Sequence, residues 1–590
     1  MRLRFATRFA KNGVAMWRPS SSFCTALVAL VTLALTPHTA LSEALTLADV
    51  QRIIAQAISR AEITSRNALI AVTDREGFVL GVWSVAGGNP TADRVGAAIS
   101  EAGTATYLST NENAFSSRTA QFVIQQNFPE GVDNRPPGPL VGIEFSQLPF
   151  SDANRFKRIA PGPNGELPAV PGGGFAPGGT AVSLGTGIFN TRLSGRSSGF
   201  PLYKRGELVG GIGVFSGLQD DLARAVRVEL SNKPPGKNED ENIALTGQVG
   251  FAPSPTILAS NVFIDGLRLP YTAGAPGPPK QGRKRRKKLV VKPIGSVGNA
   301  VPGFPLSAAA PEFPYPVEIL GGRPVVIRAP IIDDPKLGIP IRGQQRLTAA
   351  EVRQIIGRVA ARAFVTRSAI KNPIGTRAQI FVSIVGNPDQ PGEPAPILGT
   401  ARTIGSALFD ANDVCPQKAR TALFFSSDKF AASTRTVGFL TQNFYPPGIN
   451  GSPPGPDGPA VPRFNPDGTV VVGTVGLQVA SSVNIDPATG KPFIPVAPPQ
   501  PPEVPPPQMI PPNPELPNGL NLFGGGFPLY RNGVLIGALG ASGDGIEVDD
   551  LLGASGIGLE FAAPEAIRAD QFFVRGARLP YAKFPRDPGL

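Results

Sequence analysis

This sequence is poor in histidine and cysteine, two residue types on which much acid–base and metal chemistry depends. Its one histidine is His38, and its two cysteines are Cys24 and Cys415. His38 and Cys24 lie in an N-terminal leader that we expect to be cleaved. A mature chain without histidine cannot use a Ser-His-Asp triad or a histidine-ligated zinc or haem. The remaining Cys415 cannot form an intrachain disulfide, and we expect it to be a buried, inert thiol.

The other candidates for proton or ligand chemistry are tyrosines and carboxylates that occur in matched pairs. These pairs are Tyr203/Tyr530, Tyr271/Tyr581, Asp49/Glu351 and Asp220/Asp549. A tyrosine can take part in proton transfer, although a half-buried sheet position is its more frequent role. The acidic pairs are predicted near helix starts, where a carboxylate also serves as a cap and complements the helix dipole. No catalytic constellation is evident, so a binding protein is favoured over an enzyme.

These pairs recur because the chain contains one sequence pattern twice. The matched segments, in the same order, are 45–61 and 347–363, 199–217 and 526–543, and 263–271 and 573–581. Ordered self-similarity of this kind indicates a tandem duplication of one domain. We place copy 1 at 43–273, a basic Pro/Gly-rich connector at 274–345 and copy 2 at 346–590. Within the connector, 324–332 has the composition of a strand.

The secondary structure is predicted from the spacing of apolar residues and from turn signals. Each copy opens with an amphipathic helix, with Thr46 or Thr348 as N-cap and an acidic residue three positions later. Asn532-Gly533 is a strong hairpin-turn signal, and Arg205-Gly206 holds the same place in copy 1. We also expect strands at 68–74 and 378–386 and helices at 97–108, 417–426 and near Asp220 and Asp549. This order predicts an α+β fold in each copy, a single antiparallel sheet flanked by helices, with extended Pro/Gly-rich loops.

The N-terminus has the features of a secretory signal peptide. A basic leader precedes the apolar stretch 23–35, which is short for a membrane span, and Ala40-Leu41-Ser42 fits a cleavage site. We therefore expect residues 1–42 to be removed and the protein to be periplasmic or secreted, with no transmembrane segment after cleavage. An uncleaved membrane anchor is the alternative interpretation.

The positive charge is concentrated in two short stretches. The net charge is +12, of which the leader supplies five and the run Arg283-Lys284-Arg285-Arg286-Lys287-Lys288 supplies six. The rest of the chain is nearly neutral, which argues against a nucleic-acid-binding surface. The basic run is typical of a solvated tether; the alternatives are contact with an anionic surface or partner, or a processing point between the copies.

Each copy is predicted to contain a long insertion, at about 129–198 and 446–522. The second insertion includes VAPPQPPEVPPPQMIPPNPELP at 496–517, which indicates extended polyproline II. A semi-rigid spacer is favoured over a ligand for a partner domain.

Three elements of the sequence together resemble a known family. The first is the opening helix that begins L-T-x-x-[DE], and the second is Lys418-Ala419-Arg420-Thr421-Ala422, a K-A-x-T-A helix. The third is a glycine-rich hairpin followed by an aspartate, which runs from Gly525 to Asp549 in copy 2. The set resembles the GlcG/HbpS-like haem-binding proteins, whose fold also occurs as the C-terminal part of some cobalamin adenosyltransferases. The long insertions and the F-x-x-G-x-R-L-P-Y element lie outside the resemblance.

The resemblance implies binding of haem or a related small molecule and assembly from like subunits, here the two copies. Without histidine, Tyr203 or Tyr530 would have to ligate the iron, helped by nearby cations that lower the phenol pKa. Lys204, Arg205 and Arg531 adjoin these tyrosines, unless strand alternation sends them to the opposite face. The candidate ligand-binding residues are Phe200, Tyr203, Gly213, Lys418, Thr421, Phe527, Tyr530 and Gly540.

Three functions remain open from the sequence. The favoured one is an exported ligand-binding protein, with haem or a related small molecule bound without histidine. The alternatives are a non-catalytic scaffold or interaction protein of the cell envelope, and a histidine-independent enzyme of small metabolites. The glycines of the hairpin do not discriminate between them, because close packing of backbone explains them without a ligand.

Overall fold

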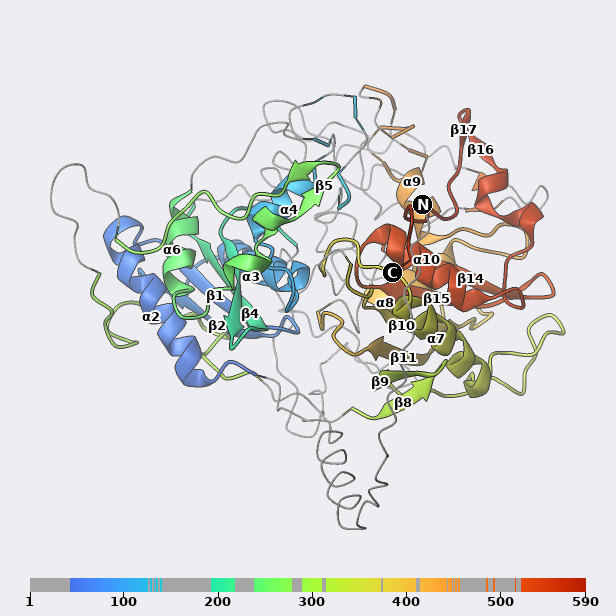
Figure 1. Cartoon of the computed structure of the whole chain (residues 1–590), viewed down its shortest axis with the longest axis horizontal. Helices are drawn as coiled ribbons and strands as arrows, with labels where there is room; N and C mark the ends of the chain where they lie inside the picture. Colours follow the sequence, from blue (N-terminus) through green and yellow to red (C-terminus); the bar gives the residue numbers. More distant parts are fainter. Residues whose placement is uncertain are drawn as a thin grey trace, which may run out of the picture. The chain divides into compact units, whose positions relative to one another are not determined.

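Two antiparallel sheets and the helices on their faces make up most of the described structure (Figure 1). The computed structural model describes residues 43–125, 128–129, 132, 134–135, 138–140, 193–217, 238–278, 289–309, 315–372, 375–409, 414–442, 444–447, 449, 451–453, 455–456, 484–485, 492–493, 515 and 521–589. The expectations for the leader, the basic run, Asp220 and nearly all of the proline-rich segment fall outside these residues. The described residues belong to one compact unit, Glu43–Leu590.

The first sheet has the strand order β3-β4-β1-β2-β7, and every pair is antiparallel. Its strands are β1 (Leu69–Asp74), β2 (Val79–Ser84), β3 (Gly199–Lys204), β4 (Glu207–Phe215) and β7 (Asn299–Ala300). The central strand β1 is buried along its whole length, which is possible because helices cover both faces.

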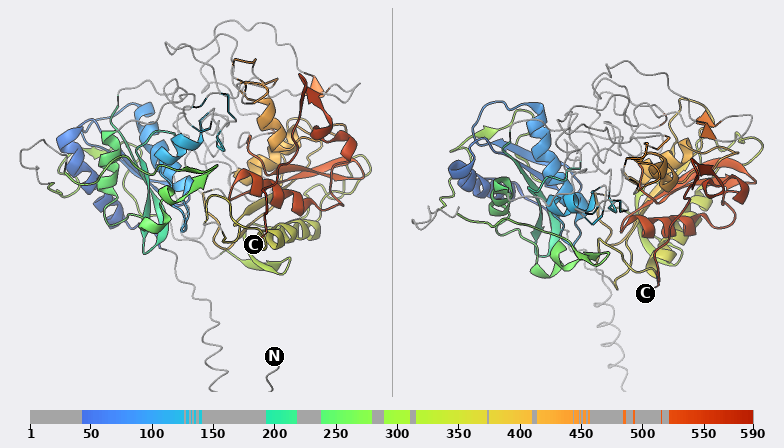
Figure 2. Two further views of the ribbon diagram at one scale, coloured as in Figure 1. Left: turned by 45° about the horizontal axis from the view of Figure 1, so that its top comes forward. Right: turned by 90° about the horizontal axis from the view of Figure 1, so that it is seen from above.

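The helices on these two faces are set by the apolar spacing of their sequences. α2 (Leu47–Thr64) and α6 (Glu239–Gly247) pack together on one face, and α3 (Ala92–Leu108) lies on the other, next to α4 (Ser117–Val123). Figure 2 shows the same arrangement from two further directions, with α2 and α3 on opposite sides of the sheet. α2 begins with the predicted capping box, in which Thr46 accepts from the Asp49 N–H at 3.1 Å.

The second sheet has the order β14-β15-β10-β11-β9-β8 and is also antiparallel. Its strands are β8 (Val317–Leu320), β9 (Arg323–Ala329), β10 (Phe381–Gly386), β11 (Ile397–Thr403), β14 (Gly526–Arg531) and β15 (Val534–Ser542). The strand expected in the connector is therefore present, as β9. The connector also supplies β8, and β7 to the first sheet, so it is more than a spacer.

The second sheet is covered in the same way as the first. α7 (Ala349–Phe364) and α10 (Ile546–Ile557) pack together on one face of this sheet. α8 (Val414–Phe424) and α9 (Thr434–Leu440) lie on the other face. Successive residues of β15 show the two faces: a Cβ on Gly540 would meet α8, whereas Leu539 contacts Gly556 of α10. Helices and antiparallel sheets are thus combined as expected for an α+β protein.

The repeated F-x-x-G-x-R-L-P-Y element forms a very small hairpin, and short 3₁₀ turns precede it in each copy. The 3₁₀ turns are Pro255–Ile257, Ala259–Asn261, Glu565–Ile567 and Ala569–Gln571, and the strand pairs are β5 (Phe263–Ile264) with β6 (Leu267–Arg268) and β16 (Phe573–Val574) with β17 (Ala577–Arg578). A further two-residue pair joins β12 (Asn484–Ile485) to β13 (Pro492–Phe493). No helix among the described residues is both long and apolar enough to cross a bilayer.

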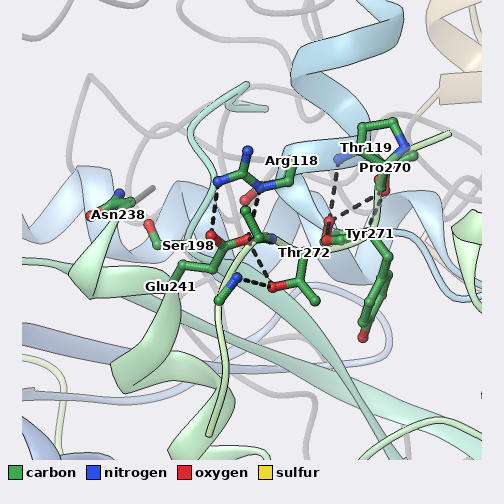
Figure 3. A network of polar contacts seen from close by, with 12 residues as sticks. Arg118, Thr119, Ser198, Asn238, Glu241, Pro270, Tyr271 and Thr272 are labelled. Atoms are coloured by element: carbon green, nitrogen blue, oxygen red, sulfur yellow. Dashed lines mark hydrogen bonds and ion pairs between the residues drawn. The ribbon is translucent and has the colours of Figure 1, made fainter. Parts of the chain in front are cut away.

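A buried ion pair anchors this element in copy 1. Figure 3 shows the Arg118 guanidinium turned toward Glu241, and its Nε and Nη2 atoms donate to the two carboxylate oxygens at 2.8 Å each. Thr272 donates to the same carboxylate at 3.0 Å, just after the element ends. Two-point pairing of this kind fixes orientation as well as charge. In copy 2 Arg435 and Asp550 pair at the corresponding place.

Candidate ligand site at the helix–hairpin contact

Close backbone contact between the glycine-rich hairpin and one helix creates the candidate site in each copy. A Cβ on Gly540 would overlap the carbonyl of Cys415 and the N–H of Ala419, both on α8. A Cβ on Gly213 would likewise overlap the backbone of α3. Gly540 and Gly213 are therefore required for packing. The close contact that they allow places neighbouring side chains of the helix against the end of the hairpin.

In copy 2 the helix residue placed there is Lys418, which is almost completely buried. Its Nζ donates to Asp549 Oδ2 at 2.8 Å and to the carbonyl of Ala541 at 2.9 Å. Lys418 is 2% exposed and Asp549 is 3% exposed. Burial raises the pKa of Asp549, and Lys418 opposes that rise. The charges are kept in the interior because each has the other as partner.

The second oxygen of this aspartate lacks a partner. Asp549 Oδ1 is buried and accepts no hydrogen bond from any residue that the structure describes. Leaving a buried carboxylate oxygen without a donor costs free energy, so an oxygen of this kind calls for an explanation. A bound ligand or an ordered water that donates a hydrogen bond to this oxygen would explain it.

The charge of Asp549 acts on the pKa of three side chains that carry hydrogens to donate. They are Lys371, Tyr107 and Cys415. Burial, followed by Asp549, raises the pKa of Tyr107 above its usual range. Burial also raises the pKa of the Cys415 thiol, so this cysteine is the buried and unreactive thiol that the sequence predicts.

Lys371 is the most perturbed amine of the cluster. Its Nζ lies 4.9 Å from the centroid of the Tyr107 ring and donates to the Tyr107 carbonyl at 3.4 Å. Burial lowers the pKa of Lys371 to about 7, against the opposing effect of the Asp549 and Asp544 carboxylates, and Lys418 lowers it further. Near neutral pH a substantial fraction of this amine is therefore uncharged.

One carboxylate of copy 2 holds the loop that carries Lys371. Asp544 accepts from the N–H groups of Ala369 at 2.6 Å, Lys371 at 2.9 Å and Asn372 at 3.2 Å. Burial raises the pKa of Asp544 to about 6, and the hydrogen bonds to its charged form oppose that rise. Three donors on one carboxylate fix the backbone of this short loop.

Two side chains of copy 1 donate hydrogen bonds to carbonyls of the same loop. Asn113 Nδ2 donates to the carbonyl of Ile370 at 2.6 Å, and Thr110 Oγ1 donates to the carbonyl of Lys371 at 2.6 Å. The Lys371 backbone is thus fixed by both copies, which restricts where its amine can lie.

Copy 1 has a different set of charges at the corresponding place. The glycine contacts of α3 and α8 align Ala102 with Ala419, so Glu101 stands where copy 2 has Lys418. Glu101 Oε2 accepts from the N–H and hydroxyl of Ser198 at 3.1 and 2.7 Å. Its Oε1 is buried and has no partner among the residues described. Burial raises the pKa of Glu101 to about 8, and Arg196 opposes the rise.

The residue of copy 1 at the place of Asp549 is Asp240 and not Asp220, so the predicted pairing of Asp220 with Asp549 is wrong; Asp240 is also more fully hydrogen-bonded than Asp549. The equivalence follows from the next residue in each copy. Glu241 pairs with the arginine of α4, and Asp550 pairs with the arginine of α9. Ser216 donates to both Asp240 oxygens, from its hydroxyl at 2.5 Å and from its N–H at 3.0 Å. Burial still raises the pKa of Asp240.

Among the residues predicted for the site, Lys418, Thr421 and Gly540 lie together at the contact of α8 with β15. Thr421 is buried and accepts from the Asn521 N–H at 2.9 Å. Gly213 has the equivalent place in copy 1. Phe200 and Phe527 are also buried, but they lie on the opposite face of the hairpin: the ring of Phe527 contacts Gly553 of α10. The structure therefore does not bring them to the charged cluster.

The two candidate tyrosine ligands use their hydroxyl protons inside the protein. The Tyr203 hydroxyl donates to the Thr110 carbonyl at 2.6 Å, and that of Tyr530 donates to the Ser427 carbonyl at 2.7 Å. Burial raises the pKa of both phenols well above 10. Ligation of iron needs the deprotonated phenol, so these positions are poor haem ligands.

The expectation that nearby cations lower these phenol pKa values is wrong. Lys204 instead pairs with Asp49 at 3.0 Å, and Arg531 pairs with Glu351 at 2.7 Å. Arg205 pairs with Glu43 at 2.8 Å. Strand alternation and the turn direct all three cations toward acids at the start of each copy, away from the buried hydroxyls.

Sequence reasoning missed Glu101, Lys371 and Tyr107. Glu101 could have been found from E-A-G-T-A at 101–105, which matches the pattern K-A-x-T-A of 418–422 except at its first residue. Lys371 has no such signal, because it lies in a loop that the repeated segments do not include. Within the described part of the chain, no cluster of three or more histidine, cysteine or acidic side chains is arranged to hold a metal ion.

Comparison with known proteins adds no identification. No protein-family model matches the chain, and no curated protein is significantly similar to it.

Proposed function

We propose that this chain is an exported ligand-binding protein built from two copies of a GlcG/HbpS-like domain. Export rests on the signal-peptide features of residues 1–42. Duplication is supported by hydrogen bonds that recur: the Tyr203 N–H donates to Phe251 O at 2.7 Å, and the Tyr530 N–H donates to Phe561 O at 3.0 Å. The matched strand orders β3-β4-β1-β2 and β14-β15-β10-β11 support it further.

The ligand site of this proposal is the charged cluster of copy 2. The observation that carries it is the buried Asp549 Oδ1, which has no hydrogen-bond donor in the described structure. A small polar molecule that donates a hydrogen bond to Asp549 would satisfy this oxygen. Two buried charges with shifted pKa values are typical of functional sites, although ion-pair networks produce them as well.

Haem held by tyrosine is not the ligand that we propose. Tyr203 and Tyr530 both donate their protons to backbone carbonyls, so ligation would cost a buried hydrogen bond and the deprotonation of a buried phenol. We expect a haemin titration of the mature chain to give no Soret shift that depends on either tyrosine.

Pairing of the two copies within one chain is part of the proposal. Tyr107 of copy 1 packs edge-to-face on Phe409 of copy 2, with ring centroids 5.2 Å apart. Arg328 Nη2 of the connector donates to both carboxylate oxygens of Glu76 at 3.2 Å. These contacts use different segments of the two copies, and the cluster around Asp549 includes Tyr107 from copy 1.

Native mass spectrometry of the mature chain, purified from its own host, tests the proposed site. We expect a small-molecule adduct that is lost in Asp549→Asn, with affinity reduced at least about tenfold, or about 1.4 kcal/mol. Asp240→Asn is the matched control: Ser216 donates to both oxygens of Asp240, so this variant should keep the adduct. Thermal unfolding should show that both variants are folded.

The absence of an adduct in the wild-type protein would contradict ligand binding at this site and leave the scaffold interpretation as the better one. An adduct that persists unchanged in Asp549→Asn would place the ligand elsewhere in the chain.

A further inference from the structure

Two arginine side chains stack on one aromatic ring next to the second sheet. The guanidinium carbon of Arg323 lies 3.2 Å from the centroid of the Phe364 ring, and that of Arg377 lies 3.5 Å from it. Each guanidinium covers a face of the ring when it stacks this closely, so the two groups lie on opposite faces. The ring therefore keeps the two positive charges within about 7 Å of each other.

Three separate segments of the fold set this arrangement. Phe364 ends α7, Arg323 begins β9, and Arg377 lies just before β10. The turn that precedes Arg323 packs on the α7 backbone, because a Cβ on Gly321 would overlap the carbonyl of Gly357. Gly357 is on the same face of α7 as Phe364, about two turns earlier. The positions of the arginines are thus fixed by the packing of the β8–β9 turn on α7.

A third arginine adds to the positive charge at this place. Arg367 lies directly opposite Arg377 in a short antiparallel bridge, so their Cβ atoms are close neighbours. Like charges placed opposite each other destabilise a strand pair. The Nη2 of Arg367 donates to the Arg586 carbonyl at 2.6 Å, which satisfies one N–H group and leaves the charge uncompensated.

No carboxylate among the described residues neutralises these three side chains. Arg323, Arg367 and Arg377 form no ion pair with the described part of the chain, and the guanidinium groups of Arg323 and Arg377 donate no hydrogen bond within it. Arg358, on the same helix, differs from them because it pairs with Glu560 at 2.7 Å. Arg377 is exposed and Arg323 is half-buried, so solvent and a ligand can reach both.

The end of α7 does not supply the missing acceptors. The carbonyls at a helix C-terminus attract cations, which favours positive charge near Phe364. The carbonyl of Arg362 already accepts from the Val365 N–H at 3.2 Å and from the Thr366 hydroxyl at 2.8 Å, and that of Ala363 accepts from the Thr366 N–H at 3.2 Å. The helix end thus accounts for part of the charge and for none of the free N–H groups.

We propose that Arg323 and Arg377, with Arg367 beside them, form a binding site for a ligand that carries phosphate groups. A guanidinium that stacks by its face keeps its edge free for two parallel hydrogen bonds to phosphate oxygens. Such a ligand supplies both the acceptors and the negative charge that the three side chains lack. The site uses none of the residues assigned to the Asp549 cluster, so it is independent of the proposed function.

Isothermal titration calorimetry of the mature chain with pyrophosphate, in a low-salt buffer, tests this site. We expect saturable binding that Arg323→Gln and Arg377→Gln each weaken at least about tenfold, because each removes charge-assisted hydrogen bonds. Arg358→Gln is the matched control: it removes the same charge from α7, yet its partner is Glu560, so the affinity should stay within about twofold of wild type. Thermal unfolding should show that all of these variants are folded.

Two conservative variants distinguish a built site from general attraction of an anion. Phe364→Leu keeps every charge but removes the ring, and Arg377→Lys keeps the charge but removes the planar fork. Both should weaken pyrophosphate binding several-fold, while neither should change the adduct that depends on Asp549. If both bind pyrophosphate as the wild type does, or if Arg358→Gln weakens binding as much as Arg377→Gln, the site is refuted.

Cosedimentation with vesicles of phosphatidylglycerol and phosphatidylcholine identifies the source of the phosphate. Binding to these vesicles that Arg323→Gln and Arg377→Gln abolish, without binding of pyrophosphate, would assign the site to a lipid headgroup. Binding of pyrophosphate alone would assign it to a free phosphate compound. If the wild-type chain binds neither probe, the proposal fails, whatever the outcome for the Asp549 site.

Discussion

At the scale of single residues, the two copies keep a buried ionisable side chain at one place, a base in copy 2 and an acid in copy 1. Copy 2 has the amine of Lys418 on its helix, and copy 1 has the carboxyl of Glu101, with Arg196 supplying positive charge nearby. The lysine was predictable from K-A-x-T-A. The glutamate was missed although E-A-G-T-A at 101–105 marks the same place, because a motif specifies residue types, whereas the interior requires only that each charge be compensated.

Glu101→Gln should remove a pH-dependent loss of stability. The pKa of Glu101 is raised from 4.5 to about 8 in the folded protein. Between these values the unfolded chain loses the proton while the folded protein keeps it, so the free energy of unfolding falls as pH rises through this window. The full effect is about 5 kcal/mol, and below pH 4.5 it vanishes. Urea unfolding at pH 5 and pH 8 should show a smaller fall in the glutamine variant than in the wild-type protein.

The exposed Glu565 provides the control for this measurement. Glu565→Gln should leave the pH dependence of unfolding as in the wild-type protein. An equal fall from pH 5 to pH 8 in Glu101→Gln and wild type would show that Glu101 ionises normally in the folded state.

Tyr203→Phe and Tyr530→Phe should affect stability rather than haem binding. Each loses a buried hydroxyl that donates to a loop carbonyl at 2.6 or 2.7 Å, which costs about 1 to 3 kcal/mol. The cost should be smaller for Tyr530→Phe, because the Ser427 carbonyl still accepts from the Phe430 N–H at 3.4 Å. Chemical denaturation measures this loss, and haemin spectra of the variants should match that of the wild-type protein. A ferric-tyrosinate spectrum in the wild type that either substitution abolishes would overturn this conclusion.

At the scale of elements, the sequence predicted the helix caps and the hairpin turn, which depend on neighbouring residues. The Thr46 and Thr348 capping boxes and the turn at Asn532-Gly533 are where the sequence indicated, because each depends on a few adjacent residues. The helix expected at 97–108 begins five residues earlier, at Ala92. The loop of Lys371 was not predictable, because its conformation depends on Asp544 and Asn113, which are distant in sequence.

Gly540→Ala should separate α8 from β15 and destabilise the protein. The added methyl group would overlap the carbonyl oxygen of Cys415, so the helix or the strand must move. Overpacking of this kind costs about 1 to 3 kcal/mol, and displacement of α8 would also weaken the pairing of Lys418 with Asp549. Thermal unfolding measures the change. Gly338→Ala is the matched control, because nothing lies within 4 Å of its added Cβ; equal stability of the two variants would contradict the packing argument.

At the scale of the whole molecule, the connector does more than its composition suggested. A Pro/Gly-rich segment reads as a linker, yet it supplies β7 to one sheet and β8 and β9 to the other. Its Arg328 contacts Glu76 of copy 1. Local sequence cannot predict these roles, because an edge strand forms only when a neighbouring strand is present to pair with it. We therefore expect the two copies to behave as one cooperative unit rather than as two domains on a tether.

Asn113→Ala tests that cooperativity at the contact that also holds the Lys371 loop. The substitution removes the hydrogen bond from Asn113 Nδ2 to the Ile370 carbonyl, at a cost of about 1 kcal/mol. Because this bond joins copy 1 to copy 2, calorimetry should show one transition in the wild-type chain and a broader or divided transition in the variant. Asn261→Ala is the control, since the Asn261 amide donates only to Pro255 and Thr256 carbonyls of its own copy among the bonds described. Two well-separated transitions already present in the wild-type chain would show that the copies unfold independently.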